Sequence, residues 1–154
     1  MKISKYMYAS MVFRSLIFVL VPKIAMAETL FTCSDAHGQV FYAEGGIVSE
    51  EDSGWDSDKI TNYKVSVTVN EEGEMDLLFY DSTETLRSAK DTGASVLPLG
   101  YNGDSNVMAI LVNWPDQTVE TYAYNAASHQ LYWAQIKYGP LLTKVTAMVS
   151  LDCQ

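Results

Sequence analysis

The stretch that decides the fold class is residues 63–81, YKVSVTVNEEGEMDLLFYD. Apolar and polar side chains alternate strictly from Tyr63 to Asn70, which is the pattern of a half-buried β-strand. The turn EEG follows, and a second alternating segment begins at Glu74. The stretch therefore predicts two antiparallel strands joined by a tight turn.

The same period continues through the chain, and the interruptions consist mainly of turn residues. Further strands are expected at 30–34, 40–42, 96–99, 106–114, 118–125, 130–138 and 141–151. The residues DAHG (35–38) predict a hairpin turn, residues 45–59 a surface loop, and residues 82–92 a short helix or a loop. These patterns predict an all-β fold, an antiparallel meander of eight or nine strands rolled into a small barrel or folded as a sandwich, with at most one short helix near 82–92.

The N-terminus has the features of a cleavable signal peptide. Basic residues precede a short apolar run at 16–21, and Ala25-Met26-Ala27 supplies the small residues that a signal peptidase requires. Residues 1–27 are therefore expected to be removed, which leaves one domain from 28 to 154 in the periplasm or outside the cell. The apolar run is too short for a membrane anchor, and Phe31 and Thr32 before Cys33 fit a lipoprotein motif poorly.

Charge limits the partners of the mature domain. Four of the ten basic residues lie in the signal, so six basic and nineteen acidic residues remain and the net charge is −13. Such a domain repels nucleic acid and anionic lipid, because phosphate binding needs a basic surface. The same field favours a basic partner.

The two cysteines are placed to fasten the ends of the domain together. Cys33 lies near the mature N-terminus and Cys153 is the penultimate residue, and exported proteins oxidise such pairs. We expect a disulfide that holds the first strand beside the last.

Motifs for catalysis, metals and cofactors are absent from the sequence. His37 and His129 are expected in surface turns without ligand spacing, the acidic segment 50–58 lacks the order of a calcium-binding loop, and no glycine-rich phosphate loop occurs. We expect no metal, no cofactor and no catalytic residue, although a triad assembled from distant Ser, His and Asp residues stays open.

Aromatic residues provide the candidate binding site. Two neighbouring strands carry a dense cluster of them, and a wall of tyrosines combines flat apolar area with hydroxyl groups. The alternative interpretation is ordinary core packing. The candidate residues are Tyr122, Tyr124, Tyr132, Trp133, Tyr138 and, in the acidic loop, Trp55.

No family is assigned from the sequence. The segment Phe31-Thr32-Cys33 with a cysteine at the end of a small exported β-domain resembles bacterial inhibitors of C-type lysozyme, but their inhibitory loop is missing. The early Gly-x-Trp signature of lipocalins is also missing. Three function classes remain: a binding module for a small apolar molecule or a protein, an inhibitor of a basic secreted or periplasmic enzyme, and a hydrolase with an unrecognised site.

The signal peptide makes a testable prediction. Protein isolated from its natural source should have Glu28 as its first residue, because cleavage is expected after Ala27. Intact-mass spectrometry measures this directly. A retained Met1 or an acylated Cys33 would contradict the prediction.

Overall fold

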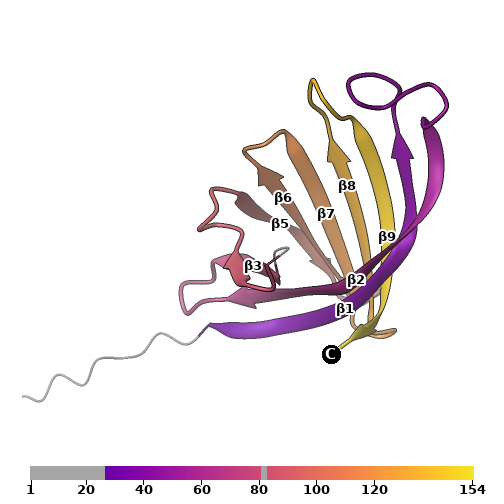
Figure 1. Ribbon diagram of the computed structural model, residues 1–154. Helices are drawn as coiled ribbons and strands as arrows, with labels where there is room; N and C mark the ends of the chain where they lie inside the picture. Colours follow the sequence, from indigo (N-terminus) through magenta and orange to yellow (C-terminus); the bar gives the residue numbers. More distant parts are fainter. Residues whose placement is uncertain (1–26, 81–82) are drawn as a thin grey trace, which may run out of the picture.

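The computed structural model describes residues 27–80 and 83–154, so the expected signal sequence up to Met26 lies outside the described residues. Within them the chain forms a single curled sheet (Figure 1). No helix occurs in these two ranges, and hence none that is long and apolar enough to cross a membrane. The strands are β1 (Glu28–Tyr42), β2 (Gly54–Val69), β3 (Met75–Tyr80), β4 (Leu86–Ser88), β5 (Ser95–Asn102), β6 (Val107–Trp114), β7 (Thr118–Asn125), β8 (Gln130–Lys137) and β9 (Lys144–Cys153). The predicted all-β class is confirmed.

The first and last strands pair in the middle of the sheet. The strand order is β4-β3-β2-β1-β9-β8-β7-β6-β5, and every neighbouring pair is antiparallel. Cys33 lies opposite Cys153, with Cα atoms 4.1 Å apart, and the two residues form a disulfide. The predicted bond and the predicted pairing of the terminal strands are both confirmed, and the bond is compatible with an oxidising compartment.

The two edges of the sheet are joined by a short piece of chain. Every strand of the sheet runs opposite to its neighbours, so β4 and β5, at the two edges, run in the same direction. Only residues 89–94 separate these two strands in the chain. Parallel neighbours need a much longer crossover, so β4 and β5 act as one bent strand that pairs with β3 at one end and β6 at the other. The meander thus has eight strand positions around a curl, with a seam at this bend.

The turn predicted at DAHG is wrong, because β1 continues through it as a bulge. Asp35 has a φ of 52°, and the pairing with β2 shifts register between Ser34 and Ala36. The bulge exchanges the faces of the strand, so Cys33 before it and Ala36 after it are both buried. A turn-forming sequence therefore bends a 15-residue strand instead of ending it.

Two other expected segments also differ. The predicted surface loop 45–59 ends early, since β2 begins at Gly54 and pairs Trp55 with Phe41. The possible helix near 82–92 does not form in residues 83–92, which hold β4 and a turn; Asp81 and Ser82 lie outside the described residues. Neither segment has the alternating sequence pattern of a strand. Each becomes extended because it pairs with a neighbouring strand.

Stacked aromatic rings fill the curl and join its two halves. The ring centroids of Phe31 and Tyr124 are 4.4 Å apart, and Tyr63 stacks on Trp133 at 5.6 Å. Each pair contributes about 0.5–1.5 kcal/mol beyond its buried area. The halves β1–β3 and β6–β8 are therefore held together by packing across the curl.

The disulfide should contribute a large part of the stability. Replacing both Cys33 and Cys153 by Ser frees a loop of 120 residues, for which the chain-entropy model gives a loss of about 4–5 kcal/mol in the free energy of unfolding. Urea denaturation of the double variant against the oxidised protein measures it. A loss below about 1 kcal/mol would show that strand pairing alone fixes the ends.

Candidate functional site

The inner face of the sheet becomes polar toward one end. Three cross-strand rows on β7 and β8 show the change: Tyr122 lies opposite Trp133, Glu120 opposite Gln135, and Thr118 opposite Lys137. The polar rows lie at the end of the curl remote from the disulfide, beside the turn that joins β6 to β7. Alternation places all of these side chains on the concave face.

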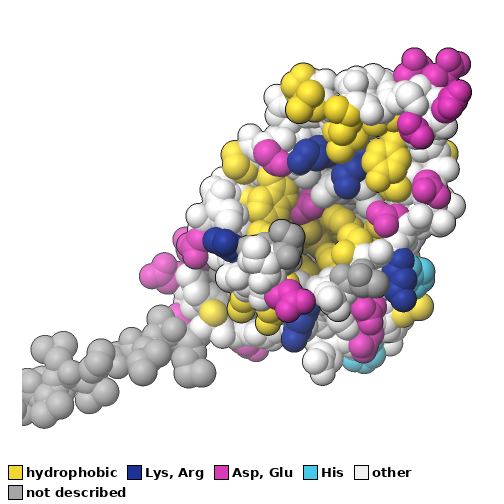
Figure 2. Space-filling view, in the orientation of Figure 1, with side chains coloured by type: hydrophobic (Ala, Val, Ile, Leu, Met, Phe, Trp, Pro, Cys, Tyr) yellow, Lys and Arg dark blue, Asp and Glu magenta, His cyan; other side chains and the backbone are white. Residues whose placement is uncertain are grey.

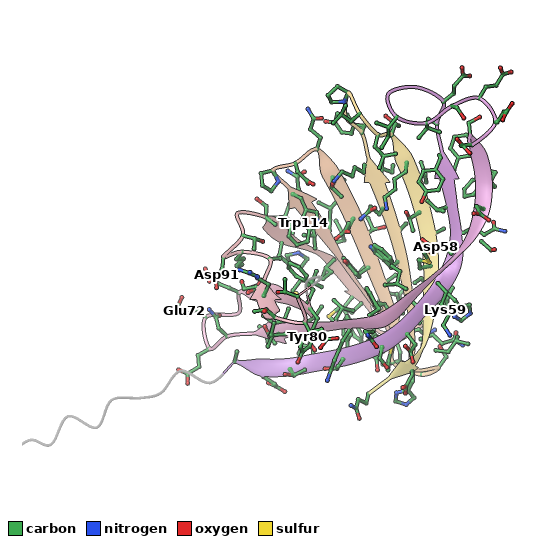
Figure 3. All side chains as sticks on the ribbon, viewed as in Figure 1. Asp58, Lys59, Glu72, Tyr80, Asp91 and Trp114 are labelled. Carbon is green, nitrogen blue, oxygen red and sulfur yellow. A yellow bond between two sulfur atoms is a disulfide. The ribbon has the colours of Figure 1, made fainter. Side chains whose placement is uncertain are left out.

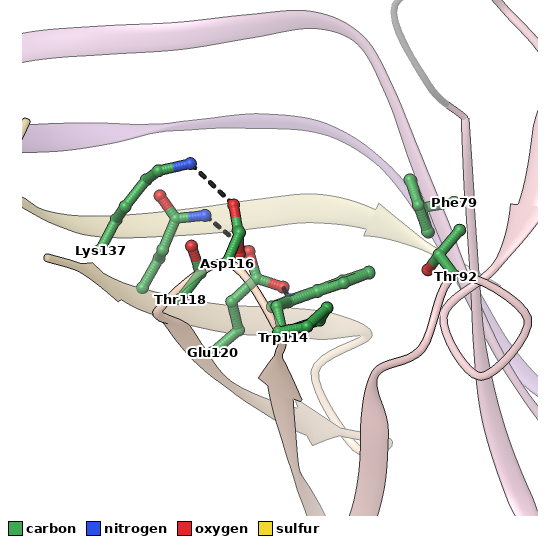
Figure 4. Close-up of a pocket in the computed structure, with 9 residues that line it drawn as sticks. Phe79, Thr92, Trp114, Asp116, Thr118, Glu120 and Lys137 are labelled. Atoms are coloured by element: carbon green, nitrogen blue, oxygen red, sulfur yellow. Dashed lines mark hydrogen bonds and ion pairs between the residues drawn. The ribbon is translucent and has the colours of Figure 1, made fainter. Parts of the chain in front are cut away.

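A hollow of about 370 Å³ opens at this polar end (Figure 4). Its volume lies within the range of small-molecule sites. In the space-filling view, hydrophobic, acidic and basic side chains all border the hollowed face (Figure 2). The hollow is lined by Phe79, Thr92, Trp114, Pro115, Asp116, Thr118, Glu120, Gln135 and Lys137.

Glu120 is a buried carboxylate at the centre of the wall. Its side chain accepts three hydrogen bonds, and the residue is only 6% exposed. Trp114 Nε1 donates to Oε2 at 2.7 Å, and Tyr122 Oη donates to the same oxygen at 2.8 Å. Gln135 Nε2 donates to Oε1 at 2.6 Å. Four side chains from β6, β7 and β8 thereby hold one another in place.

Other polar atoms in the wall have no partner in the part of the chain that the structure describes. Gln135 Oε1 and Thr118 Oγ1 are buried and make no hydrogen bond of normal geometry; the Thr118 hydroxyl is near enough to Asp116 to help lower the pKa of that carboxyl, and Thr118 is 5% exposed. Leaving such a group unsatisfied costs about 1–3 kcal/mol. Because both atoms belong to residues that line the hollow, they mark it as a place where a ligand can supply the missing bonds.

An ion pair stands at the rim. Lys137 Nζ lies 2.8 Å from Asp116 Oδ2, and both side chains are partly exposed (Figure 4). The hydrogen bond from the Lys137 ammonium lowers the pKa of the Asp116 carboxyl. Asp116 therefore stays ionised at neutral pH and engages the ammonium of Lys137.

Two tyrosines near Glu120 are kept protonated. Burial raises the pKa of Tyr122 well above its usual value, and the nearby Tyr63 and Glu120 raise it further. Burial and the charge of Glu120 also raise the pKa of Tyr63, and the contact with the Tyr122 hydroxyl offsets only part of this rise. Both hydroxyls remain donors over the physiological range.

The six aromatic residues predicted from the sequence do not form one surface. Tyr122, Tyr124 and Trp133 point inward and are at most 8% exposed. Tyr132 lies opposite Ala123, one register position away from Trp133, so it points outward. Tyr132, Tyr138 and Trp55 are 45–61% exposed. The tyrosine faces of the two strands therefore do not coincide, and a role in binding stays a prediction for each residue.

Sequence reasoning missed most of the residues that build the hollow. Alternation on β7 does place Thr118 and Glu120 on the face of Tyr122, so a signal for these two existed. Trp114 projects into the space that the sheet encloses (Figure 3), and Gln135 reaches Glu120 only through the register of β7 and β8. No local pattern reveals such a pairing.

The histidines lie apart from the hollow. His37 is in β1, not in a turn as predicted, and His129 is at the turn after β7, with Nδ1 3.5 Å from Tyr124 Oη. Within residues 27–80 and 83–154, no group of three or more His, Cys, Asp or Glu side chains is arranged to hold a metal ion.

Comparison with known proteins gives no relative: no family model, no curated protein and no solved structure matches this chain.

The buried tyrosines make a pH prediction. Above pH ~10 the unfolded chain loses phenolic protons that Tyr63 and Tyr122 retain in the folded state. The free energy of unfolding that these tyrosines contribute is fully present below this pH. Above it, the free energy of unfolding should fall by about 1.4 kcal/mol per pH unit for each tyrosine. Urea denaturation at a series of alkaline pH values measures the slope.

Two variants test whether Tyr63 and Tyr122, and not the other tyrosines, cause this alkaline loss of stability. Changing both Tyr63 and Tyr122 to Phe should flatten the alkaline slope, whereas Tyr138→Phe, at an exposed ring, should leave it unchanged. An unchanged slope in the double variant would contradict the assignment.

Proposed function

We propose that this chain is an exported binding module, and that its hollow takes a small ligand with an apolar body and a hydrogen-bonding head. The observation that carries the proposal is the wall described above, in which Gln135 Oε1 and Thr118 Oγ1 are buried and no described residue makes a hydrogen bond of normal geometry with either atom. Buried polar atoms without hydrogen bonds destabilise a fold, and they are retained most readily where a bound molecule supplies those bonds.

The opposite side of the hollow suits the apolar body. Phe79 from β3 meets Trp114 from β6 edge to face, with ring centroids 5.3 Å apart. Figure 4 shows Phe79 and Thr92 across the opening from the polar wall. A ligand can therefore contact aromatic carbon on one side and polar atoms on the other, as small-molecule sites commonly require.

Benzyl alcohol is a minimal probe of this proposal. It should shift the Trp114 indole N–H resonance in a two-dimensional NMR titration, with a dissociation constant on the order of 1 mM for a molecule of this size. Absence of saturable shifts at residues that line the hollow would reject the proposal.

Thr118→Val tests whether the unpartnered hydroxyl serves binding. The variant keeps the side-chain shape and should raise the free energy of unfolding by roughly 1 kcal/mol while it weakens the probe severalfold. Thr146 offers a control, because its hydroxyl is also buried without a partner among the described residues, and the residue neighbours Gln135 on β9 but does not line the hollow. Thr146→Val should stabilise the protein similarly and leave binding unchanged.

A further inference from the structure

The charges around the hollow do not balance. Lys137 and Asp116 form an ion pair and offset each other. Glu120 is the remaining charged residue of the lining, and among residues 27–80 and 83–154 its side chain is held only by the neutral groups of Trp114, Tyr122 and Gln135. The site therefore holds one uncompensated negative charge, and burying such a charge is costly unless a cation accompanies it.

The vacant hydrogen-bonding positions of the wall are mainly acceptors. A carboxylate offers about four lone-pair positions, and Glu120 uses three, two at Oε2 and one at Oε1. Gln135 directs its NH₂ group to Glu120, so the amide oxygen, which only accepts, is the atom left over. The Thr118 hydroxyl adds an oxygen that can also accept.

These three oxygens lie close together on the sheet. Glu120 and Thr118 are two residues apart on the same face of β7, and Gln135 is the direct cross-strand neighbour of Glu120 on β8. A primary ammonium has three N–H donors, one positive charge and no acceptor. It matches this set in number, in hydrogen-bonding sense and in charge.

We infer that the head of the ligand is a primary ammonium group bound by Glu120, Gln135 and Thr118, and that its apolar body packs on Trp114 and Phe79. This inference rests on the proposed function, since it names the ligand class of the same hollow. The net charge of −13 in residues 28–154 also concentrates small cations near the domain.

Comparison of benzylamine with benzyl alcohol tests the inference on the unaltered protein. The two probes have nearly the same shape, and at pH 7 only the amine carries a charge. Benzylamine should bind about tenfold more tightly, because hydrogen bonds to a charged group are roughly twice as strong as neutral ones. Equal affinities would overturn the inference and leave the proposed function standing, whereas no binding of either probe would reject both.

Glu120→Gln assigns the preference to one residue. In this variant the tenfold preference for the amine should disappear, so that the two probes bind with about equal affinity. Glu72→Gln is the matched control, because it removes the same charge from an exposed turn of the chain (Figure 3). An amine preference that survives Glu120→Gln would overturn the inference; if that variant does not fold, the comparison on the unaltered protein decides alone.

The ammonium can come from a free amine or from a lysine side chain of a protein. Nα-acetyl-lysine methylamide and its norleucine counterpart separate these sources. Tighter binding of the lysine compound than of benzylamine would support a protein segment, and the reverse order would support a free amine. A norleucine compound that equals the lysine compound would contradict the ammonium assignment.

Discussion

The antiparallel pairing of β1 with β9 is the constraint on which the rest of the structure depends. Without it the meander would stay open at β1 and β9, and the halves β1–β3 and β6–β8 would each keep one face exposed. Their union places the aromatic rings of one half against those of the other, and the Cys33–Cys153 disulfide fixes the register at the end of the pair. The hollow lies farther along the same curl, so its shape follows from this pairing.

The inner face combines two demands that normally conflict. Toward the disulfide it is a dry core of stacked rings, and toward the other end it buries a carboxylate and several unpartnered polar atoms. A domain devoted only to stability would place apolar side chains at Glu120 and Thr118. The stacked apolar core stabilises the domain enough to offset the destabilising polar groups at the other end, as is usual where part of a fold binds a ligand.

The fold could largely be predicted from the sequence, because a period of two is a local signal that residues 63–70 and 118–125 carry on their own. Residues whose state depends on distant partners could not. Asp35 has turn chemistry but forms a bulge because β2 and β9 flank it, and Trp55 lies in an acidic stretch that becomes a strand only through Phe41. The site could not be predicted for the same reason. Gln135 lies opposite Glu120 because of the register between β7 and β8, and the same register places Tyr132 on the outer face and Trp133 on the inner face.

The position of the disulfide has a practical consequence for how the molecule can be attached to other things. Because the bond and the β1–β9 pair bring Thr32 and Gln154 within hydrogen-bonding distance, the C-terminal residue lies beside β1, four residues from the first residue of that strand, Glu28. The polar wall of the hollow lies on β7 and β8, toward the ends of these strands that are level with Lys144 and not with Cys153. A surface, tether or fused domain joined at the C-terminal end would leave the polar wall free, and the proximity of the two ends suits the domain to circular permutation or insertion into a loop of another protein.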